Sequence, residues 1–467
     1  MKNETLLGVK LSVFFVLIIS FSIAGCRKKN ALPFHEYDFS QIKEKGEINA
    51  LILSGSTSYF IYKGEPKGYE YELLSDFAEN QRLKLNIKLA ENESQLIEML
   101  LNGEGDLIAC KFPITNEGKE ILLYTGREVI NQQVLIQRSN KGDTLLKDVT
   151  ELIGKDVWVI RDTKYYRRLE NLNDELGGGI NIQTIDKDTV STEDLIEQVA
   201  KGKISYTISD ADLAKLNKTY FHNINISLIV GHPQRASWAV RKTSPELASA
   251  IDEWFMENKN DIRYKAIIKR YFEMSKMPGD EPVPIIGNGQ ISPYDSCFKE
   301  YAKLINWDWR LLVSISFQES KFHTNLISWA GATGLMGLMP KTAEAMGITQ
   351  EETTQVEPSI RAATRLIRRL NQSFSFIENE EERIKFIVAA YNSGSGHIYD
   401  ARALAEKYGK NPNVWEENVE ECLKLKSIPE YYNNPIVKQG YFRGTETINY
   451  VRSVIERWKY YEIKVKK

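Results

Sequence analysis

The stretch WRLLVSISFQESK, residues 309–321, is the most informative segment of this sequence for both fold and chemistry. Leu312 and Ile315 lie on one face of a predicted helix, and Glu319 extends the same stripe at i+7. An ionised carboxylate at the core-facing end of an apolar stripe is costly unless it is paired, so this position suits a general acid of the kind that cleaves glycosidic bonds. The alternative is that the helix end is exposed and Glu319 simply faces water.

Two segments that follow have the features of a binding groove. Residues 331–340 read GATGLMGLMP, in which glycines permit close backbone approach while Met336 and Met339 offer a flexible apolar wall. A helical pattern over 381–391 places the hydroxyl of Tyr391 at the end of an apolar face, just before the helix-stop sequence NSG. A buried tyrosine needs a polar partner, which a carboxyl group or a sugar supplies. Each feature alone is more often packing than chemistry.

The composition describes a globular protein of several domains. At about 150 residues per domain, the 467 residues suggest about three domains. The chain is 42% apolar and 27% charged, which excludes a disordered protein. A net charge of -2 gives no support to nucleic-acid binding, which usually needs a basic excess. The cysteines are too few for a disulfide scaffold, and the scattered histidines lack zinc-ligand spacing.

The N-terminus has the features of a bacterial secretion signal. Lys2 and Lys10 precede an apolar run over 11–24, which is shorter than the roughly 20 residues of a membrane span. The small residues before Cys26 resemble the lipobox of bacterial lipoproteins, in which the cysteine is acylated and becomes the new N-terminus. Arg27 after it implies, by the same resemblance, the outer membrane facing the periplasm. The alternative is an uncleaved anchor helix with an incidental cysteine.

The rest of the chain divides into two halves with different residue patterns. Strand-like runs alternate with helix-like runs up to about residue 274, which indicates an α/β domain with a largely parallel sheet. Prolines and glycines then mark a linker, and from Ser296 onward helical periodicity dominates. The predicted organisation is a signal peptide (1–25), a tether (26–44), an α/β domain (45–274), a linker (275–292) and an all-α domain (293–467).

Taken together and in this order, the C-terminal segments resemble the lysozyme-like lytic transglycosylases, which cut bacterial peptidoglycan. Glu319-Ser320 matches that family's Glu-Ser motif, residues 334–340 its Gly-Leu-Met motif, and residues 390–394 its Ala-Tyr-Asn motif. The stretches HIYDARALAEKYGKNP at 397–412 and RGTETINYV at 443–451 look like one subgroup, the membrane-bound lytic murein transglycosylases F.

This resemblance implies that Glu319 is the single catalytic acid and base, with no cofactor and no metal. Glu319 would protonate the glycosidic oxygen between N-acetylmuramic acid and N-acetylglucosamine, and then take the proton of the muramic C6 hydroxyl as a 1,6-anhydro ring closes. Because no water is consumed, the implied reaction is that of a lyase. The sequence departs from the motif at Gly337, where many members carry Gln. The implied substrate-binding residues are Ser328, Met336, Met339, Tyr391, Asn392, Glu446 and Tyr450.

The N-terminal half resembles the type II periplasmic solute-binding proteins of family 3, which capture amino acids between two lobes. The stretches GYEYELLSDFA (68–78), LNGEGDLIAC (101–110) and SYTISDA (205–211) carry this resemblance. That family's carboxylate-binding arginine would fall near Gly118 and is missing, so a free amino acid would lose its bidentate clamp. The resemblance implies a sensor or positioning domain for muropeptides or stem peptides; the alternative is a vestigial cleft that only spaces the enzyme from the membrane. The candidate ligand residues are Tyr69, Thr115 and Asp210.

We therefore predict an α/β plus all-α protein, with a two-lobed periplasmic-binding-protein-like (type II) N-terminal domain and a lysozyme-like helical C-terminal domain. Its expected partners are peptidoglycan glycan strands, a muropeptide or stem-peptide ligand, and the membrane through lipidated Cys26, but no nucleic acid. Two other functions stay open at this stage. One is a muramidase that uses water, and the other is a non-catalytic, lipid-anchored protein that binds wall fragments.

Overall fold

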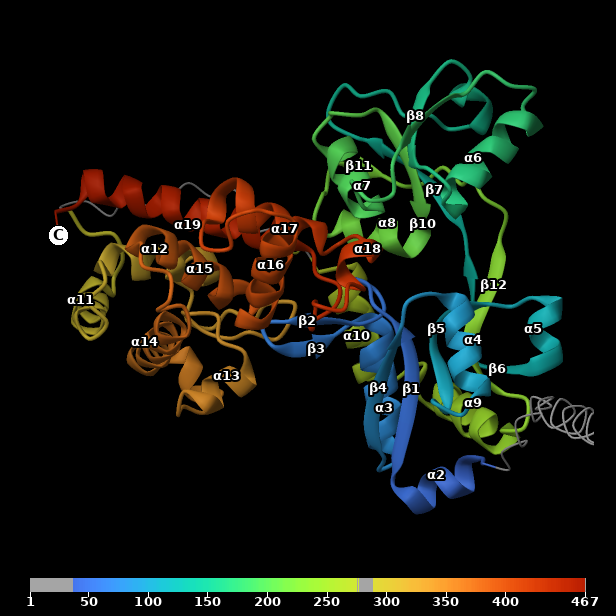
Figure 1. Cartoon of the computed structure of the whole chain (residues 1–467), viewed down its shortest axis with the longest axis horizontal. Helices are drawn as coiled ribbons and strands as arrows, with labels where there is room; N and C mark the ends of the chain where they lie inside the picture. The colour runs from blue at the N-terminus through green and yellow to red at the C-terminus, as the bar shows by residue number, and fades with distance from the viewer. Residues whose placement is uncertain (1–36, 275, 277–288, 467) are drawn as a thin grey trace, which may run out of the picture.

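The computed structural model describes residues 37–274, 276 and 289–466. The predicted signal peptide and Cys26 lie outside the described residues. Figure 1 shows three bodies: two lobes of mixed helix and strand, and a helical domain beside them that carries the C-terminus. Within the described ranges, no helix combines the length and the apolar character that crossing a membrane requires.

The first lobe is built on a five-stranded sheet with the order β4-β1-β5-β12-β6. Strand β1 pairs in parallel with both β4 and β5, as the predicted α/β pattern requires, and β12 pairs antiparallel with β5 and β6. The strands are β1 (Glu47–Leu53), β4 (Lys84–Ala90), β5 (Leu107–Pro113), β6 (Leu122–Asn131) and β12 (Gln234–Arg241). Its helices are α2 (Phe39–Lys45), α3 (Tyr69–Asn80), α4 (Glu93–Leu101), α5 (Asn116–Ile121), α9 (Pro245–Asn258) and α10 (Ile262–Phe272).

The second lobe is inserted between β6 and β12, so the chain passes from one lobe to the other twice. Its sheet has the order β11-β7-β10-β8-β9, with β8 parallel to β9 and β10. The strands are β7 (Gln133–Arg138), β8 (Asp156–Ile160), β9 (Asn181–Ile185), β10 (Tyr206–Asp210) and β11 (Ile224–Asn225). The helical segments are η1 (Val149–Leu152), α6 (Lys164–Glu175), α7 (Thr192–Ala200) and α8 (Ala211–Lys218).

A short hairpin leaves the first lobe and projects toward the helical domain (Figure 1). It consists of β2 (Phe60–Tyr62) and β3 (Glu65–Lys67), joined by a two-residue turn at Lys63 and Gly64. Both turn residues have positive φ angles, 49° and 79°, which is the pattern of a type I′ turn. Lysine is an unusual residue in this left-handed conformation, so the tip of the hairpin holds backbone strain.

The helical domain surrounds α12 (Trp309–Ser320), the helix predicted from the opening stretch. Asp308 caps its first turn, and Lys321 ends it with a left-handed φ of 51°. Nearly every α12 side chain is buried, against α11 and α19 in particular. The other helical segments are α11 (Asp295–Lys303), α13 (Pro340–Ala345), η2 (Glu351–Thr354), α14 (Val356–Ser373), α15 (Glu380–Ser393), α16 (Ser395–Lys407), η3 (Trp415–Val419), α17 (Glu420–Leu425), α18 (Pro429–Tyr432) and α19 (Gly444–Lys464).

One continuous apolar core joins the first lobe to the helical domain. Trp329 and Met339 of the helical domain are buried in the same cluster as Tyr69 and Tyr271 of the lobe. The ring of Trp329 lies 5.2 Å from that of Tyr62 on the hairpin, measured between centroids. Helix α2, within the segment predicted as a tether, packs on α9 of the same lobe. The two halves are thus in extensive contact.

Candidate active site

The site is built around Glu319, in the last turn of α12. Its side chain is only 9% exposed, so the alternative that it faces open water is wrong. The hydroxyl of Tyr450, on α19, donates a hydrogen bond of 2.7 Å to Glu319 Oε1. Burial and the nearby Glu319 carboxyl raise the pKa of Tyr450 well above its ordinary value, which keeps this phenol a hydrogen-bond donor.

The glycine-rich segment comes against the other side of the carboxyl group. Gly337 has a φ of +59°, and a Cβ atom added there would lie 2.2 Å from Glu319 Oε2. No side chain fits at this position while Glu319 keeps its place. The departure from the family motif at Gly337 is therefore part of the packing around the acid.

The sequence argument treated Glu319 as an unpaired acid, and the structure corrects it. The Lys63 ammonium, at the tip of the β2–β3 hairpin, lies 3.2 Å from Glu319 Oε1 and 3.1 Å from Oε2. The Lys63 side chain is 8% exposed, and its Nζ also lies 3.4 Å from the carbonyl oxygen of Gly337. The lysine therefore supplies a buried countercharge and covers the face of Glu319.

Backbone contacts hold this hairpin against the helical domain. The amide of Lys63 donates to the Ser393 carbonyl over 3.1 Å, and His397 Nε2 lies 2.9 Å from the Ile61 carbonyl. Burial and the adjacent Lys426 ammonium, 2.8 Å from Nδ1, hold the pKa of His397 well below its usual range. The ring is thus neutral, with its proton on Nε2, where it donates to the hairpin.

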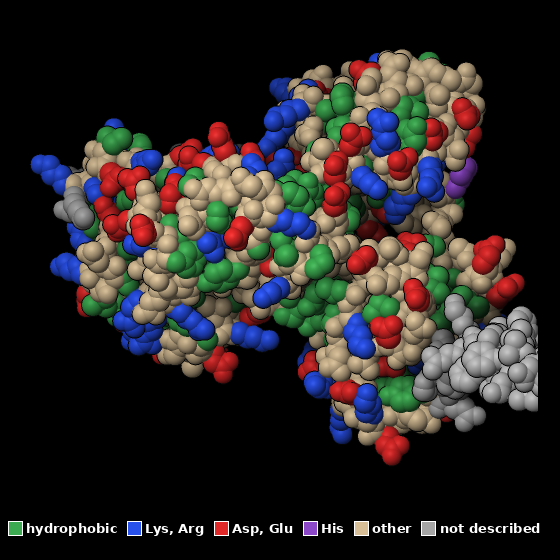
Figure 2. All heavy atoms as spheres, viewed as in Figure 1, with side chains coloured by type: hydrophobic (Ala, Val, Ile, Leu, Met, Phe, Trp, Pro, Cys, Tyr) green, Lys and Arg blue, Asp and Glu red, His purple; other side chains and the backbone are tan. Residues whose placement is uncertain are grey.

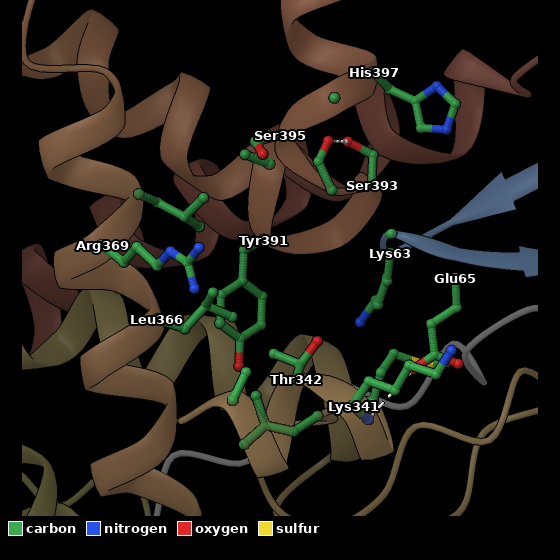
Figure 3. Close-up of a pocket in the computed structure, with 18 of the residues that line it drawn as sticks. Lys63, Glu65, Lys341, Thr342, Leu366, Arg369, Tyr391, Ser393, Ser395 and His397 are labelled. Carbon is green, nitrogen blue, oxygen red and sulfur yellow. Dashed lines mark hydrogen bonds between the residues drawn. The ribbon is translucent and has the colours of Figure 1, made fainter. Parts of the chain in front are cut away.

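Behind Lys63 opens a groove of about 470 Å³, shown in Figure 3. Its walls come from α13, α14, the junction of α15 with α16, and the hairpin of the first lobe. Tyr391 and Met339, both predicted from sequence, line it. Tyr391 donates its hydroxyl hydrogen to the Met336 carbonyl over 2.7 Å, so it shapes the groove wall and leaves the direct contact with Glu319 to Tyr450.

The remaining predicted residues of this domain lie around the site in other contacts. Asn392 accepts a hydrogen bond from Thr447 on α19 (2.6 Å), and Ser328 Oγ accepts one from the Ala332 amide (3.0 Å). Met336 is buried in the core of the helical domain. Glu446 is buried facing the N-terminal half, and burial raises the pKa of its carboxyl. The described cysteines, Cys110, Cys297 and Cys422, are all free.

A second, larger cavity of about 1110 Å³ lies between the two lobes. Asp210 lines it, as predicted, and forms an ion pair of 2.5 Å with Lys164. Tyr69 and Thr115 do not line this cavity, because Tyr69 is buried in the core and Thr115 caps α5. Gly118 has no room for the missing arginine, since a Cβ there would lie 2.0 Å from the Tyr124 hydroxyl.

Sequence reasoning missed two features of this cavity and its surroundings. The buried Glu70 and the half-buried Lys111 line it, although no motif singled them out. The helical domain also contributes to its wall through α18 and Tyr441. Lys63 was missed as well, and its only local signal is the Lys-Gly pair between two short strand-like runs. None of these contacts is encoded by neighbouring residues.

Comparison with known proteins agrees with the two halves seen in the structure. The family model for the transglycosylase SLT domain matches residues 296–414, and that for bacterial extracellular solute-binding proteins, family 3, matches residues 54–274. A membrane-bound lytic murein transglycosylase F from Desulfosudis oleivorans is 32% identical over 91% of each chain. One from Stutzerimonas stutzeri is 28% identical over 98% of this chain and 92% of its own. The open substrate-binding domain 2 of Lactococcus lactis GlnP aligns with 49% of this chain and 97% of its own, at 18% identity and a TM-score of 0.42.

Proposed function

Because this chain belongs to the membrane-bound lytic murein transglycosylase F family, we propose that it cleaves the muramic acid–glucosamine bond of peptidoglycan without water and leaves 1,6-anhydromuramyl ends. The family makes it a lyase-type transglycosylase, with peptidoglycan as its substrate. The observation that carries the finer proposal is the geometry at Glu319. Glu319 is one buried carboxyl next to Lys63 and Gly337, which line the groove, and it has a hydrogen-bond donor on one side and a glycine backbone on the other.

In the proposed reaction, Glu319 acts twice. It first gives its proton to the glycosidic oxygen as that bond breaks, and the Tyr450 hydroxyl then stabilises the carboxylate that remains. The carboxylate next takes the proton of the muramic C6 hydroxyl, whose oxygen bonds to C1 and closes the anhydro ring. Each proton that leaves Glu319 is therefore replaced within the same turnover.

The groove supports a single-acid mechanism over a muramidase with two carboxylates. Glu65 is the carboxylate among the residues that line the groove, and it belongs to the hairpin, where it pairs with Lys67 at 3.7 Å. A hydrolase of the usual kind needs a second carboxylate about 5–9.5 Å from the first. Glu65 therefore offers a matched control for the acid, because it lies in the same groove but comes from the other domain.

The test digests purified sacculi with the full-length protein and its variants. Mass spectrometry is expected to show anhydromuramyl ends from the natural protein, none from Glu319→Gln, and unchanged ends from Glu65→Gln. Reducing muramic ends, heavier by one water, would establish the muramidase alternative. Equal digestion by Glu319→Gln would remove Glu319 from the mechanism.

We further propose that the N-terminal domain is a sensor that holds the enzyme inactive until a muropeptide or stem peptide binds. Lys63 covers the acid, and the residues just before its hairpin, 54–58, line the cavity between the lobes. A ligand that rearranges these residues therefore shifts the population of the docked hairpin. A synthetic stem peptide is expected to accelerate sacculus digestion by the natural protein but not by Lys63→Met. An unchanged rate in the natural protein would refute the sensor.

Finally, we propose that a lipid on Cys26 anchors the protein in the outer membrane, facing the periplasm, after removal of a signal peptide. The basis is the lipobox-like sequence, and the named relatives are membrane-bound. Two or more acyl chains hold a protein on a bilayer where one does not. Cys26→Ser is expected to move the protein from the outer-membrane fraction to the soluble periplasmic fraction. Retention of Cys26→Ser in the membrane fraction would favour an uncleaved anchor helix.

A further inference from the structure

The groove beside Glu319 is lined by cationic side chains, two of which, Lys341 and Arg369, have no charged partner among the described residues. Its charged lining residues are Glu65 and three cations, Lys63, Lys341 and Arg369. Lys63 is paired with Glu319, and Glu65 is paired with Lys67. Among the described residues, the side chains of Lys341 and Arg369 form no ion pair or hydrogen bond.

The neighbouring residues show what a structural arginine looks like on the same helix. Arg365, one turn before Arg369 on α14, donates a hydrogen bond of 2.7 Å to the Met346 carbonyl and so secures the turn after α13. Arg369 instead extends into the groove beside Tyr391, while Lys341 lies near Glu65 at its other side (Figure 3). Figure 2 shows that Lys and Arg side chains gather on this edge of the helical domain, over α13 and α14.

The groove therefore suits an anionic group carried by the substrate. In an intact peptidoglycan strand each muramic lactyl carboxyl is bound to its peptide as a neutral amide, so the strand is anionic where the attached peptides present free carboxylates. Carboxylates are the groups that guanidinium and ammonium donors bind best. The polar lining of the groove, which includes Thr342, Ser373 and Ser395, provides further donors and acceptors for a peptide or sugar.

We propose that Arg369 and Lys341 bind the carboxylates of the stem peptides, so that the enzyme prefers strands with free peptide carboxylates to strands in which these carboxylates are amidated. This inference rests on the proposed transglycosylase function, and it adds a specificity that the function alone does not require. Both side chains are exposed, so their replacement leaves the core unchanged. Arg368, the next residue on α14, is also exposed but does not line the groove, which makes it a matched control.

The test compares two substrates, intact glycan strands and strands whose peptide carboxylates have been converted to neutral amides, because removal of the whole peptide would expose the muramic lactyl carboxylates. Arg369→Gln and Lys341→Gln are each expected to lower kcat/KM on intact strands about fivefold, the upper range for an exposed ion pair, through a higher KM. Their kcat/KM on amidated strands is expected to stay that of the natural protein, and Arg368→Gln is expected to behave like the natural protein on both substrates. The natural preference for intact strands should also shrink as salt rises from about 50 mM to about 500 mM, because screening weakens exposed charge pairs.

The outcomes separate this proposal from the function on which it rests. Equal losses on intact and amidated strands, an equal loss in Arg368→Gln, or no loss in either variant would overturn the carboxylate site while leaving the transglycosylase in place. Failure of the natural protein to cleave either substrate would instead refute the proposed function.

Discussion

Replacement of Lys63 by methionine tests the consequence of the central observation, that the N-terminal hairpin covers Glu319, the proposed catalytic acid. Methionine keeps a long unbranched side chain but removes the ammonium that contacts both Glu319 oxygens. A hydrogen bond to a charged group stabilises the bonded state by about 1.5–3 kcal/mol. If the docked form dominates, loss of this pair raises the population of uncovered sites about tenfold to a hundredfold. The rate of sacculus digestion is expected to rise by the same factor.

The assay follows the release of soluble fragments from dye-labelled sacculi by the full-length protein. Lys67→Met is the control, because Lys67 belongs to the same hairpin and pairs with Glu65, at 3.7 Å, without touching Glu319. It is expected to leave the rate within about twofold of the natural protein, because the 3.7 Å separation between Lys67 and Glu65 is too long for a hydrogen bond and the pair does not involve Glu319. A Lys63→Met rate at or below the natural one would refute the reasoning, because it would make Lys63 part of the catalytic machinery or the contact irrelevant to turnover.

Three further changes probe the acid and the contact between the domains. Tyr450→Phe removes the hydrogen bond to Glu319 and is expected to lower kcat at least about tenfold with KM unchanged; an unchanged kcat would show that the phenol only packs. Gly337→Ala is expected to slow digestion because its Cβ would shift the Glu319 carboxyl, whereas Gly331→Ala, also at positive φ (+91°) but in open space, is expected to cost stability alone. Equal activity in the two alanine variants would contradict the close approach. Burial lowers the pKa of Lys276 from its ordinary value of 10.5 to about 7. Between these two pH values the unfolded chain carries a proton on the Lys276 amine that the folded chain lacks. The free energy of unfolding therefore decreases as the pH falls from about 10.5 to about 7. The Tm of the natural protein minus that of Lys276→Met is therefore expected to increase from pH 7 to pH 9. Parallel curves of Tm against pH for the two proteins would rule this out.

The fold class was predictable because its signals are local. The helix predicted from residues 309–321 is α12, and the helical pattern over 381–391 lies within α15, since helical periodicity is read along the chain. Both domain types followed from motifs of this kind. The placement of α2 on the first lobe could not be predicted, because the contact of α2 with α9 joins residues some 200 positions apart in sequence.

The candidate site was predictable in part, and the division has a physical reason. Glu319 could be singled out because it extends the apolar stripe of its own helix, and Tyr450 because it lies in a stretch that resembles the family's sequence. That they meet was not visible, since the hydrogen bond between them spans 131 residues. The roles of Tyr69 and Thr115 differed from expectation, because nothing in a strand-to-helix motif says which side of it will face the cavity.

By itself, the sequence determined the two architectures, because periodic burial and short motifs act over a few residues, and it singled out Glu319 as the proposed acid. Only the tertiary structure decided that Lys63 pairs with that acid. The hairpin that carries the lysine is short and its turn is strained, so it has no strong local signature. It reaches Glu319 because an apolar surface on the first lobe is buried against the helical domain, and burial between parts that are distant in sequence is decided only when the whole chain has folded.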